Sequence, residues 1–351
     1  MKTYKIAAIP GDGIGTEVIS AGVEVLQALA KRAGSFQFKV DHFDWGGEYY
    51  KKHGRMMPED GLEQVRKHDA VFFGAAGWPA TVPDHVSLWG LLIPFRRNFQ
   101  QYVNLRPVRL MPGVKCPLAD RKPGDIDFWV VRENSEGEYS SIGGRMYSGT
   151  DEEFATQQAI FSRRGTDRIL RFAFELARKL GKKHVTSATK SNGISITMPY
   201  WDERFKAMAG QYPDIKTDQY HIDILTAHFV MHPDWFDVVV GSNLFGDILS
   251  DEASMLTGSI GMLPSASLDG NNKGLYEPAH GSAPDIAGKN MANPLATIMS
   301  AAMMLRYTFN QEEAARRIEA AVKKVLAQGY RTADIHETET RRVGTIEMGD
   351  A

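Results

Sequence analysis

The chain of 351 residues is long enough for two or more compact units, and 43% hydrophobic with 24% charged residues is typical of a folded globular protein. The formal net charge of -2, without a long run of lysine or arginine, offers no electrostatic footprint for nucleic acid. We therefore expect small molecules or a second copy of the chain as partners.

The single cysteine, Cys116, excludes an internal disulfide framework and a thiolate-rich zinc site. It lies in a turn-like segment without an activating base nearby in sequence, so an inert loop thiol is expected. The N-terminal segment lacks the pattern of a secretory leader, and no apolar run approaches the roughly 18 residues of a membrane span. These features predict a cytoplasmic location and no membrane partner.

Strand-like and helix-like segments alternate along the chain, which indicates an α/β protein with much parallel sheet. A first strand is expected at 6–9, followed by a turn at 11–15 and a helix at 16–33. Further on, the apolar spacing predicts helices and strands at 166–180 (helix), 185–188 (strand), 236–240 (strand), 293–309 (helix) and 311–328 (helix). Residues 138–164 are polar and glycine-dotted, which indicates a long excursion or an arm.

The turn at 11–15 has the pattern Gly-x-Gly-x-Gly, but Thr16 stands where the dinucleotide-binding fingerprint needs its third glycine. A tight strand-to-helix turn is the simpler interpretation. Such a turn, at the start of a helix, can still lie beside a cofactor.

Acidic residues follow a second strand-to-helix transition. Asp247 and Asp251 lie one helical turn apart on the same face, where like charges disfavour the helix. A hard cation such as Mg2+ or Mn2+ would explain the pair, although acids near a helix start also complement its dipole. Asp223, flanked by apolar residues, is a third candidate, with a helix cap as the alternative.

Basic and aromatic side chains close several apolar segments. Arg96, Arg106 and Arg132 could form a clamp for a dicarboxylate, because guanidinium groups bind carboxylates in a bidentate way. Lys190 ends a strand-like segment and Tyr139 follows Arg132 closely. For each of these side chains the alternative is a surface ion pair or a solvated position. The glycine-rich and alanine-rich segment 277–290 is a loop whose small residues let a ligand approach the backbone.

Together these stretches resemble the isocitrate and 3-isopropylmalate dehydrogenase family, the β-decarboxylating dehydrogenases of 2-hydroxy acids. The resemblance runs from residue 6 to about residue 351, and its motifs are Pro-Gly-Asp-Gly-Ile-Gly (10–15), Asn-Leu-Arg-Pro (104–107), Asn-Leu-Phe-Gly-Asp-Ile-Leu-Ser-Asp (243–251) and His-Gly-Ser-Ala-Pro-Asp-Ile-Ala-Gly (280–288). It implies an α/β, two-domain fold with a mixed, largely parallel central sheet that is not a standard Rossmann fold. The implied domains are an NAD-binding domain, 1–100 plus 255–351, and a substrate, metal and dimerisation domain, 101–254, whose arm 138–164 clasps a second subunit.

The resemblance also implies roles for the candidate residues. Arg96, Arg106 and Arg132 would hold the substrate carboxylates, and Asp223, Asp247 and Asp251 would hold Mn2+ or Mg2+. Lys190, with Asp223, would take the hydroxyl proton, and Tyr139 would protonate the carbon that loses CO2. The NAD site would be lined by Ile14, Asn192, Glu277, His280, Gly281, Ser282, Ala283, Asp285 and Asn293.

Within the family, the segment before Arg96 looks most like the tartrate and D-malate dehydrogenases. Isocitrate enzymes place serine and asparagine where Gly90 and Leu92 align, so the donors for a third carboxylate are missing. Isopropylmalate enzymes carry valine and an acid where this chain has Gly193 and Trp89. We therefore expect D-malate or a tartrate as the substrate, with K+ as a further cofactor implied by the tartrate-type resemblance.

Three alternatives are a 3-isopropylmalate dehydrogenase, a non-catalytic regulatory subunit of the same family, and a Rossmann-type NAD reductase. The regulatory subunit is disfavoured because the arginines, the lysine, the tyrosine and the aspartates are all in place. The Rossmann-type enzyme is disfavoured by Thr16 in the fingerprint.

Overall fold

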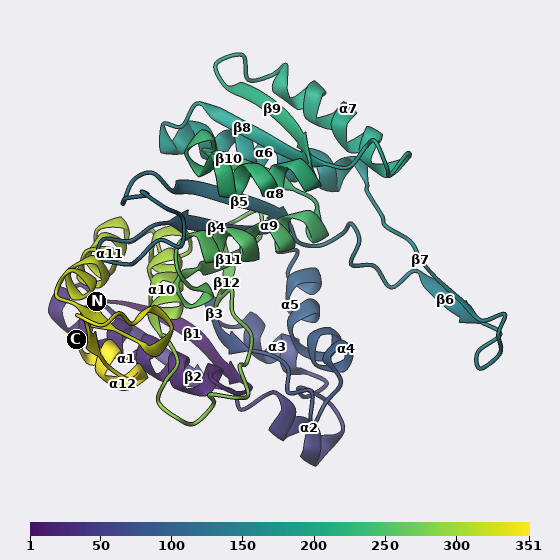
Figure 1. Cartoon of the computed structure of the whole chain (residues 1–351). Coiled ribbons are helices and arrows are strands. Elements are labelled where there is room, and N and C mark those ends of the chain that lie inside the picture. Colours follow the sequence, from purple (N-terminus) through teal and green to yellow (C-terminus); the bar gives the residue numbers. More distant parts are fainter. The chain divides into compact units, whose positions relative to one another are not determined.

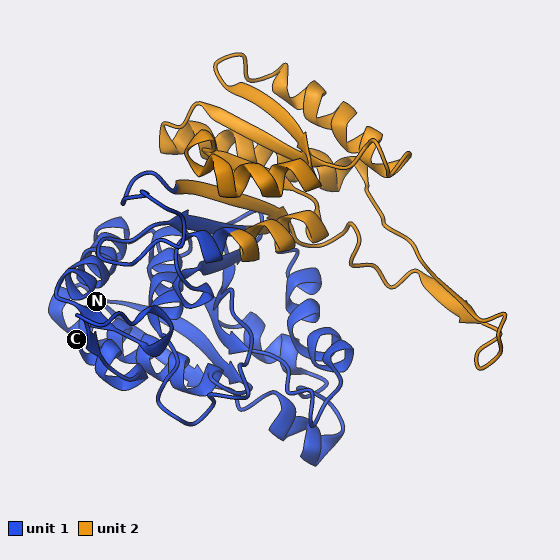
Figure 2. Ribbon diagram, viewed as in Figure 1, with its two compact units in different colours: residues 1–101, 105–126, 253–351 blue, residues 102–104, 127–252 orange.

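The computed structural model describes residues 1–351 and divides into two compact units (Figure 2). Unit 1 comprises residues 1–101, 105–126 and 253–351, and unit 2 comprises residues 102–104 and 127–252. Residues 105–126, which the expected boundary placed in the second domain, fall in unit 1. No helix is both long and apolar enough to cross a membrane.

The strands of unit 1 lie in the order β2-β1-β3-β12-β11-β4. β1 pairs in parallel with β2 and β3, β3 pairs in parallel with β12, and β11 and β12 form an antiparallel pair. The bounds are β1 (Lys2–Gly11), β2 (Phe36–His42), β3 (Ala70–Ala75), β4 (Val103–Arg109), β11 (Pro264–Leu268) and β12 (Gly274–Pro278).

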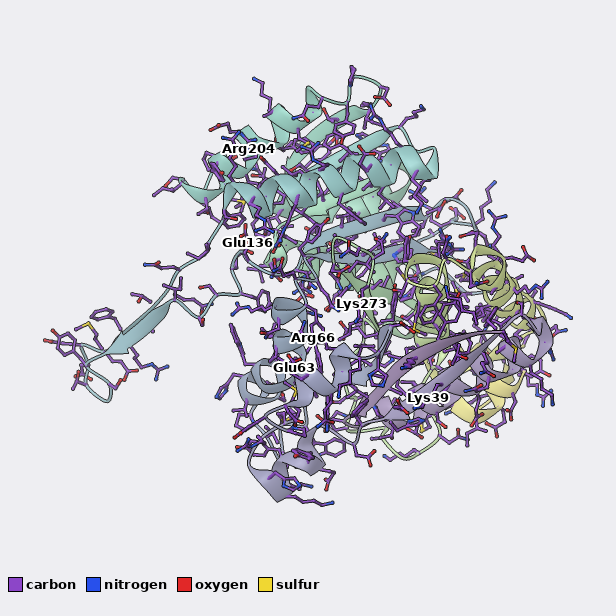
Figure 3. The ribbon with its side chains drawn as sticks, turned by 180° about the vertical axis from the view of Figure 1, so that it is seen from behind. Lys39, Glu63, Arg66, Glu136, Arg204 and Lys273 are labelled. Atoms are coloured by element: carbon purple, nitrogen blue, oxygen red, sulfur yellow. The ribbon has the colours of Figure 1, made fainter.

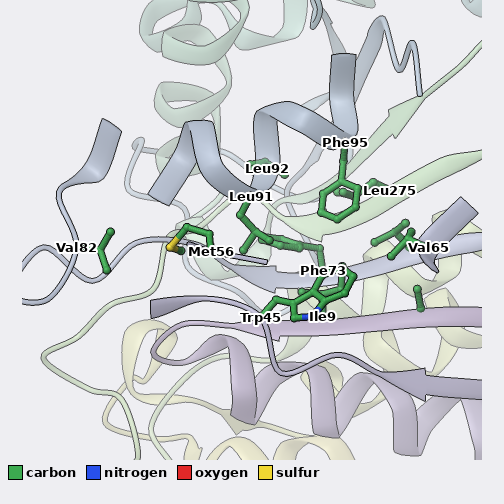
Figure 4. Packing of buried hydrophobic residues seen from close by; sticks show 12 residues of the cluster. Ile9, Trp45, Met56, Val65, Phe73, Val82, Leu91, Leu92, Phe95 and Leu275 are labelled. Atoms are coloured by element: carbon green, nitrogen blue, oxygen red, sulfur yellow. The ribbon is translucent and has the colours of Figure 1, made fainter. Parts of the chain in front are cut away.

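Two layers of helices cover the sheet of unit 1 (Figure 1). Helices α1 and α10 pack directly on the strands, α11 packs on α10, and α12 packs on α1. On the other face, a hydrophobic cluster joins alternate residues of β1 and β3 to the segment before Arg96 (Figure 4). The helices are α1 (Gly15–Ala33), α2 (Gly47–His53), α3 (Gly61–Arg66), α4 (Asp84–Ser87), the π-helical turn η1 (Leu88–Leu92), α5 (Ile93–Asn98), α10 (Leu295–Tyr307), α11 (Glu312–Ala327) and α12 (Thr345–Asp350).

Short elements complete unit 1. They are the 3-10 turns η3 (Ile260–Met262) and η4 (Ala333–Ile335), and the parallel two-stranded pair β13 (Tyr330–Arg331) and β14 (Arg341–Arg342).

Unit 2 contains four parallel strands in the order β5-β10-β8-β9. Because they are parallel, their carboxyl ends meet at one edge, where α/β proteins place ligands. The strands are β5 (Asp127–Glu133), β8 (His184–Thr189), β9 (Lys216–His221) and β10 (Val238–Gly241). The helices are α6 (Arg163–Leu180), α7 (Thr197–Ala209), α8 (Ile222–Met231), the 3-10 turn η2 (Pro233–Trp235) and α9 (Asn243–Leu256), whose residues from 253 onward fall in unit 1. The expected α/β class with a mixed, largely parallel sheet is confirmed.

Helix α6 starts three residues before its expected position at 166. The side chain of Ser162 accepts a hydrogen bond from the backbone N–H of Gly165 at 2.9 Å and so caps the helix. The expected end is correct, since Gly181 adopts a left-handed conformation with φ of 69°.

The segment 138–164 contains an antiparallel hairpin of β6 (Gly143–Met146) and β7 (Phe154–Gln157), whose residues are all exposed. At its base, Gly137 bridges Ile160, and both carboxylate oxygens of Glu136 accept from Ser162 (Glu136 is labelled in Figure 3). The base of the hairpin is therefore anchored at the start of α6.

Candidate functional site

Most of the expected catalytic residues lie at the carboxyl ends of the strands of unit 2. Arg132 lies near the end of β5, in register with Gly241, the last residue of β10. Lys190 directly follows β8, and α8, which carries Asp223, directly follows β9.

Arg132 is buried and held against the start of α9. Its Nη2 and Nε donate to Oδ1 of Asn243 at 2.7 and 3.1 Å, and its Nη1 forms an ion pair with Asp247. A Cβ added to Gly246 would come within 2.6 Å of the Arg132 Cβ, so only glycine permits this close approach. The sequence interpretation gave Asn243 no role, because a single amide has no charge pattern to mark it.

Tyr139 reaches the same carboxylate. Its hydroxyl donates to Oδ2 of Asp247 at 3.0 Å, and the Arg132 guanidinium lies 5.4 Å from the centroid of its ring. The structure therefore brings Arg132, an expected carboxylate clamp, and Tyr139, an expected proton donor, into contact with Asp247, an expected metal ligand.

The position of Tyr139 depends on its neighbour Glu138, which sequence reasoning missed. The two carboxylate oxygens of Glu138 accept from the Ser242 hydroxyl at 2.7 Å and from the Leu244 backbone N–H at 3.0 Å. This carboxylate fastens the chain beside Tyr139 to the start of α9. Its partners are about a hundred residues away in sequence, so no local pattern could have revealed the contact.

Lys190 and Asp223 also meet. The Lys190 Nζ donates to Oδ1 of Asp223 at 2.8 Å, and this hydrogen bond lowers the pKa of Asp223. Asn192, expected at the NAD site, is exposed in the turn after β8 and belongs to unit 2, whereas the other expected NAD residues belong to unit 1.

The three expected metal ligands come from two helices. Asp247 and Asp251 lie one turn apart on α9, and Asp223 lies in the first turn of α8. Within the single chain, no group of three or more His, Cys, Asp or Glu side chains is placed to hold a metal ion. A donor set made only of carboxylate oxygens has the chemistry that Mg2+ or Mn2+ prefers.

In unit 1, the turn at 11–15 is packed against the loop that follows β12. The Ile14 backbone N–H donates to the Ser282 carbonyl at 2.8 Å, and a Cβ on Gly13 (φ of 57°) would lie 2.0 Å from that oxygen. Ile14 and Val18 pack with Ala292, and Ala283 and two neighbouring loop residues cover them. Two expected NAD residues that are far apart in the sequence, Ile14 and Ser282, thus lie in direct contact.

Asp12, within this turn, is buried and was not assigned from the sequence. Its two oxygens accept from the backbone N–H groups of Gly47 at 2.6 Å and Gly77 at 2.9 Å. It joins the turn to the start of α2 and to the loop after β3.

Arg96 and Glu277 form a buried ion pair, with 2.9 Å between Nη2 and Oε1. The Arg96 Nε is buried without a hydrogen-bond partner, so part of the guanidinium remains able to donate. Arg106 is also buried in unit 1, and its Nε lies 3.4 Å from the Ser265 hydroxyl.

His280 is buried with one nitrogen satisfied. Its Nδ1 lies 2.9 Å from the Gly281 carbonyl, which assigns the proton to Nδ1 and leaves Nε2 as an acceptor without a partner. Burial lowers the pKa of this imidazole. A buried acceptor without a partner is the kind of atom that a ligand's hydroxyl or amino group would satisfy.

Asn293 is oriented by Asp334, another residue that the sequence interpretation missed. The Asn293 Nδ2 donates to Asp334 at 3.0 Å, while its Oδ1 accepts from the Leu295 backbone N–H at 3.0 Å. Asp285, by contrast, is exposed on the loop.

Two of the four residues used to choose a subclass, Gly90 and Leu92, lie in or beside the core. Leu92 belongs to the hydrophobic cluster of Figure 4, and a Cβ on Gly90 would come within 2.9 Å of Cγ of the buried Met56. A side chain at position 90 would therefore have to displace Met56. A cavity of unit 1, about 590 Å3, lies among α1, α10, α11 and α12 and contains none of the expected site residues.

Relatives whose names state an enzyme activity match almost the whole chain. The D-malate dehydrogenase [decarboxylating] of Escherichia coli (strain K12) is 59% identical over 100% of this chain and 98% of its own length. The tartrate dehydrogenase/decarboxylase of Pseudomonas putida is 55% identical over 97% of this chain and 96% of its own. Among solved structures, the isocitrate dehydrogenase from Methylococcus capsulatus has a TM-score of 0.88 and 36% identity, covering 99% of this chain and 97% of that one.

The expected isocitrate dehydrogenase-like fold is thereby confirmed. Residues 5–351 match the family described as isocitrate/isopropylmalate dehydrogenase. On this match and on those of the two relatives above, the chain belongs to the isocitrate/isopropylmalate dehydrogenase family.

Proposed function

We propose that the chain catalyses the NAD-dependent oxidation, with decarboxylation, of a small 2-hydroxy dicarboxylic acid, D-malate or a tartrate. The names of the relatives at 59% and 55% identity support this substrate class. The observation that carries the proposal is the contact of Arg132 and Tyr139 with the single carboxylate of Asp247.

Three buried arginines, Arg96, Arg106 and Arg132, bind the substrate carboxylates in this proposal. A guanidinium binds a carboxylate through two parallel hydrogen bonds, which fixes orientation as well as charge. The Arg96 Nε, which has no partner, supports a role in binding.

In its neutral form, Lys190 takes the proton of the 2-hydroxyl and becomes an ammonium. The carboxylate of Asp223, 2.8 Å from the Lys190 Nζ, holds the amino group in place. Tyr139 returns a proton to the carbon that loses CO2. Its hydrogen bond to Asp247 fixes the direction of its hydroxyl beside a proposed metal ligand.

Mn2+ or Mg2+, held by Asp223, Asp247 and Asp251, would polarise the 2-hydroxyl and the adjacent carboxylate and would stabilise negative charge during decarboxylation. K+ is a further proposed cofactor. Ile14, the loop from Glu277 to Asp285 and Asn293, all of unit 1, would hold NAD, and Asn192 of unit 2 is a further proposed NAD residue. The partnerless Nε2 of His280 supports a polar ligand at this loop.

Because the single chain does not group Asp223 with Asp247 and Asp251 as a metal site, we propose a homodimer in which Lys190 and Asp223 complete the site of the partner subunit. The exposed apolar side chains of Ile224 and Ile248, on α8 and α9, support a face covered by a second copy. We also propose that unit 1 is the NAD-binding domain, that unit 2 binds substrate and metal, and that the enzyme is cytoplasmic.

The test is NADH formation with Mn2+ across D-malate, the tartrate stereoisomers, 3-isopropylmalate and isocitrate, with CO2 release followed in parallel. We expect kcat/KM for D-malate or a tartrate to exceed that for isocitrate by at least about 100-fold, because the donors for a third carboxylate are absent. Comparable turnover of isocitrate would overturn the substrate assignment, and preferred turnover of 3-isopropylmalate would favour that alternative.

A further inference from the structure

Glu17, in the first turn of α1, contacts the loop that carries Asp285. Its Oε1 accepts from the backbone N–H of Asn290 at 2.8 Å, and its Oε2 accepts from that of Gly288 at 3.2 Å. One carboxylate thus satisfies two amides that belong to neither a helix nor a strand.

These two amides depend on a side chain because of the local backbone. Gly288 and Asn290 have φ values of 74° and 53°, in the left-handed region, so the segment cannot continue a helix or a strand. A carboxylate is the side chain group with two equivalent acceptor oxygens. Glutamine would offer one acceptor and turn an NH2 group towards the other backbone N–H.

The contact with Glu17 is one of several that fix the loop against the start of α1. The earlier part of the loop is fixed by the hydrogen bond from Ile14 to the Ser282 carbonyl, and Ala283, Ile286 and Ala287 pack on Ile14 and Val18. Glu17 fixes the later part. Asp285 lies exposed between the two fixed parts.

We propose that Glu17 is a positioning residue for the cofactor: it holds residues 283–290 in the conformation that binds the adenosine half of NAD. This inference rests on the proposed function, since it takes the loop as part of the NAD site. Glu17 acts through the two amides and does not itself contact the nucleotide, so its loss weakens nucleotide binding and leaves the chemical step intact.

The experiment compares Glu17→Gln with Glu24→Gln, a matched control on the exposed part of the same helix. For Glu17→Gln we expect the Kd and KM for NAD to rise about tenfold, equivalent to about 1.4 kcal/mol, with kcat within about twofold of the wild type. Glu24→Gln should change neither constant. Glu17→Asp keeps both oxygens on a shorter side chain, so its Kd should lie between those of the wild type and Glu17→Gln.

Hydrogen exchange of the nucleotide-free protein is the second measurement. Peptides that cover 283–290 should exchange faster in Glu17→Gln than in the wild type, with unchanged exchange in α10. Unchanged Kd and unchanged exchange in a folded Glu17→Gln variant would overturn the inference. If the wild type itself binds no NAD, the proposed function fails, whereas the exchange of residues 283–290 still decides whether Glu17 holds the loop.

Discussion

The Nζ of Lys190 and Oδ1 of Asp223 are 2.8 Å apart, and they follow the ends of two neighbouring parallel strands, β8 and β9. Arg132 and Tyr139 contact a different carboxylate, that of Asp247. The expected catalytic and substrate-binding residues of unit 2 thus form two separate groups. Lys190 lies with Asp223, and Arg132 and Tyr139 lie with Asp247. We propose that each active site combines one group from each of two subunits.

Mixing two inactive variants tests this arrangement. Arg132→Ala removes the clamp from one group, and Lys190→Ala removes the base from the other. In a hybrid dimer, one site collects both defects and the other collects neither. If subunits assort randomly, about half of the dimers are hybrids, and each hybrid has one intact site of two. Refolding the two variants together should therefore restore activity to at most about a quarter of the wild type.

The matched control mixes Arg132→Ala with Tyr139→Phe. Both defects fall in the group around Asp247, so every site of a hybrid carries one of them and activity should not return. If hybrids of Arg132→Ala and Lys190→Ala are confirmed by mass and remain inactive, Lys190 must act in the same chain as Arg132.

Asp247→Asn and Asp251→Asn test the proposed metal site. Each substitution removes a charge from a hard-cation site while keeping the side chain's size, so we expect a loss of activity of at least about 100-fold with the fold intact. Asp247→Asn should also lower the melting temperature, because it breaks the ion pair with the buried Arg132. Glu203→Gln, which removes an exposed charge from α7, is the control. Full activity of the wild type after thorough chelation with EDTA would refute the metal's role, whereas inactivity that Mn2+ or Mg2+ reverses would support it.

The sequence was sufficient to predict features with a local or periodic signal. The spacing of apolar residues predicted four of the longer helices, α1, α6, α10 and α11. Gly181 correctly marked the end of α6. The strand ends carrying Arg132 and Lys190 were correctly expected, because an apolar run followed by a charged residue indicates the end of a buried strand.

The residues that were missed act across long sequence separations. Glu138 and Asp334 orient Tyr139 and Asn293 through contacts that exist only after folding. The hairpin of β6 and β7 was not predicted as strands, because its short strands are exposed on both faces and lack the alternation of a half-buried strand.

Gly90 was explained from the sequence as the loss of a substrate donor, but its contact with Met56 gives a second reason for glycine. We expect Gly90→Ser to lower the free energy of unfolding by about 1–3 kcal/mol, because the added atoms overpack the space beside Met56. In a Met56→Ala background, the same substitution should cost less, because the truncated side chain leaves room. Denaturant unfolding of the four proteins in a double-mutant cycle measures this coupling. Strictly additive effects would show that Met56 does not determine the residue at position 90.

The last prediction concerns the pH dependence of stability at the edge of unit 2, where His184 pairs with Asp218 at 2.9 Å between β8 and β9. The Asp218 carboxylate, as an acceptor for the His184 ring, raises the pKa of His184 above its ordinary value. The charged pair therefore stabilises the fold fully below the unfolded pKa of about 6.5, and this contribution is lost as the pH rises through the higher folded pKa. Asp218→Asn should be less stable than the wild type by about 1 kcal/mol near pH 5.5, with a difference that narrows towards pH 8.5.

The control is Asp214→Asn, which removes the carboxylate paired with Arg178 in the same unit. A guanidinium does not titrate in this range, so the stability difference between this variant and the wild type should stay constant from about pH 5.5 to 8.5. Thermal unfolding of the three proteins at several pH values provides the comparison. If the Asp218→Asn difference is as flat as the Asp214→Asn difference, the protonation of His184 does not contribute to stability. If it widens with rising pH, the sign of the argument is wrong, because a histidine whose pKa is raised by its partner can lose stabilisation only on deprotonation.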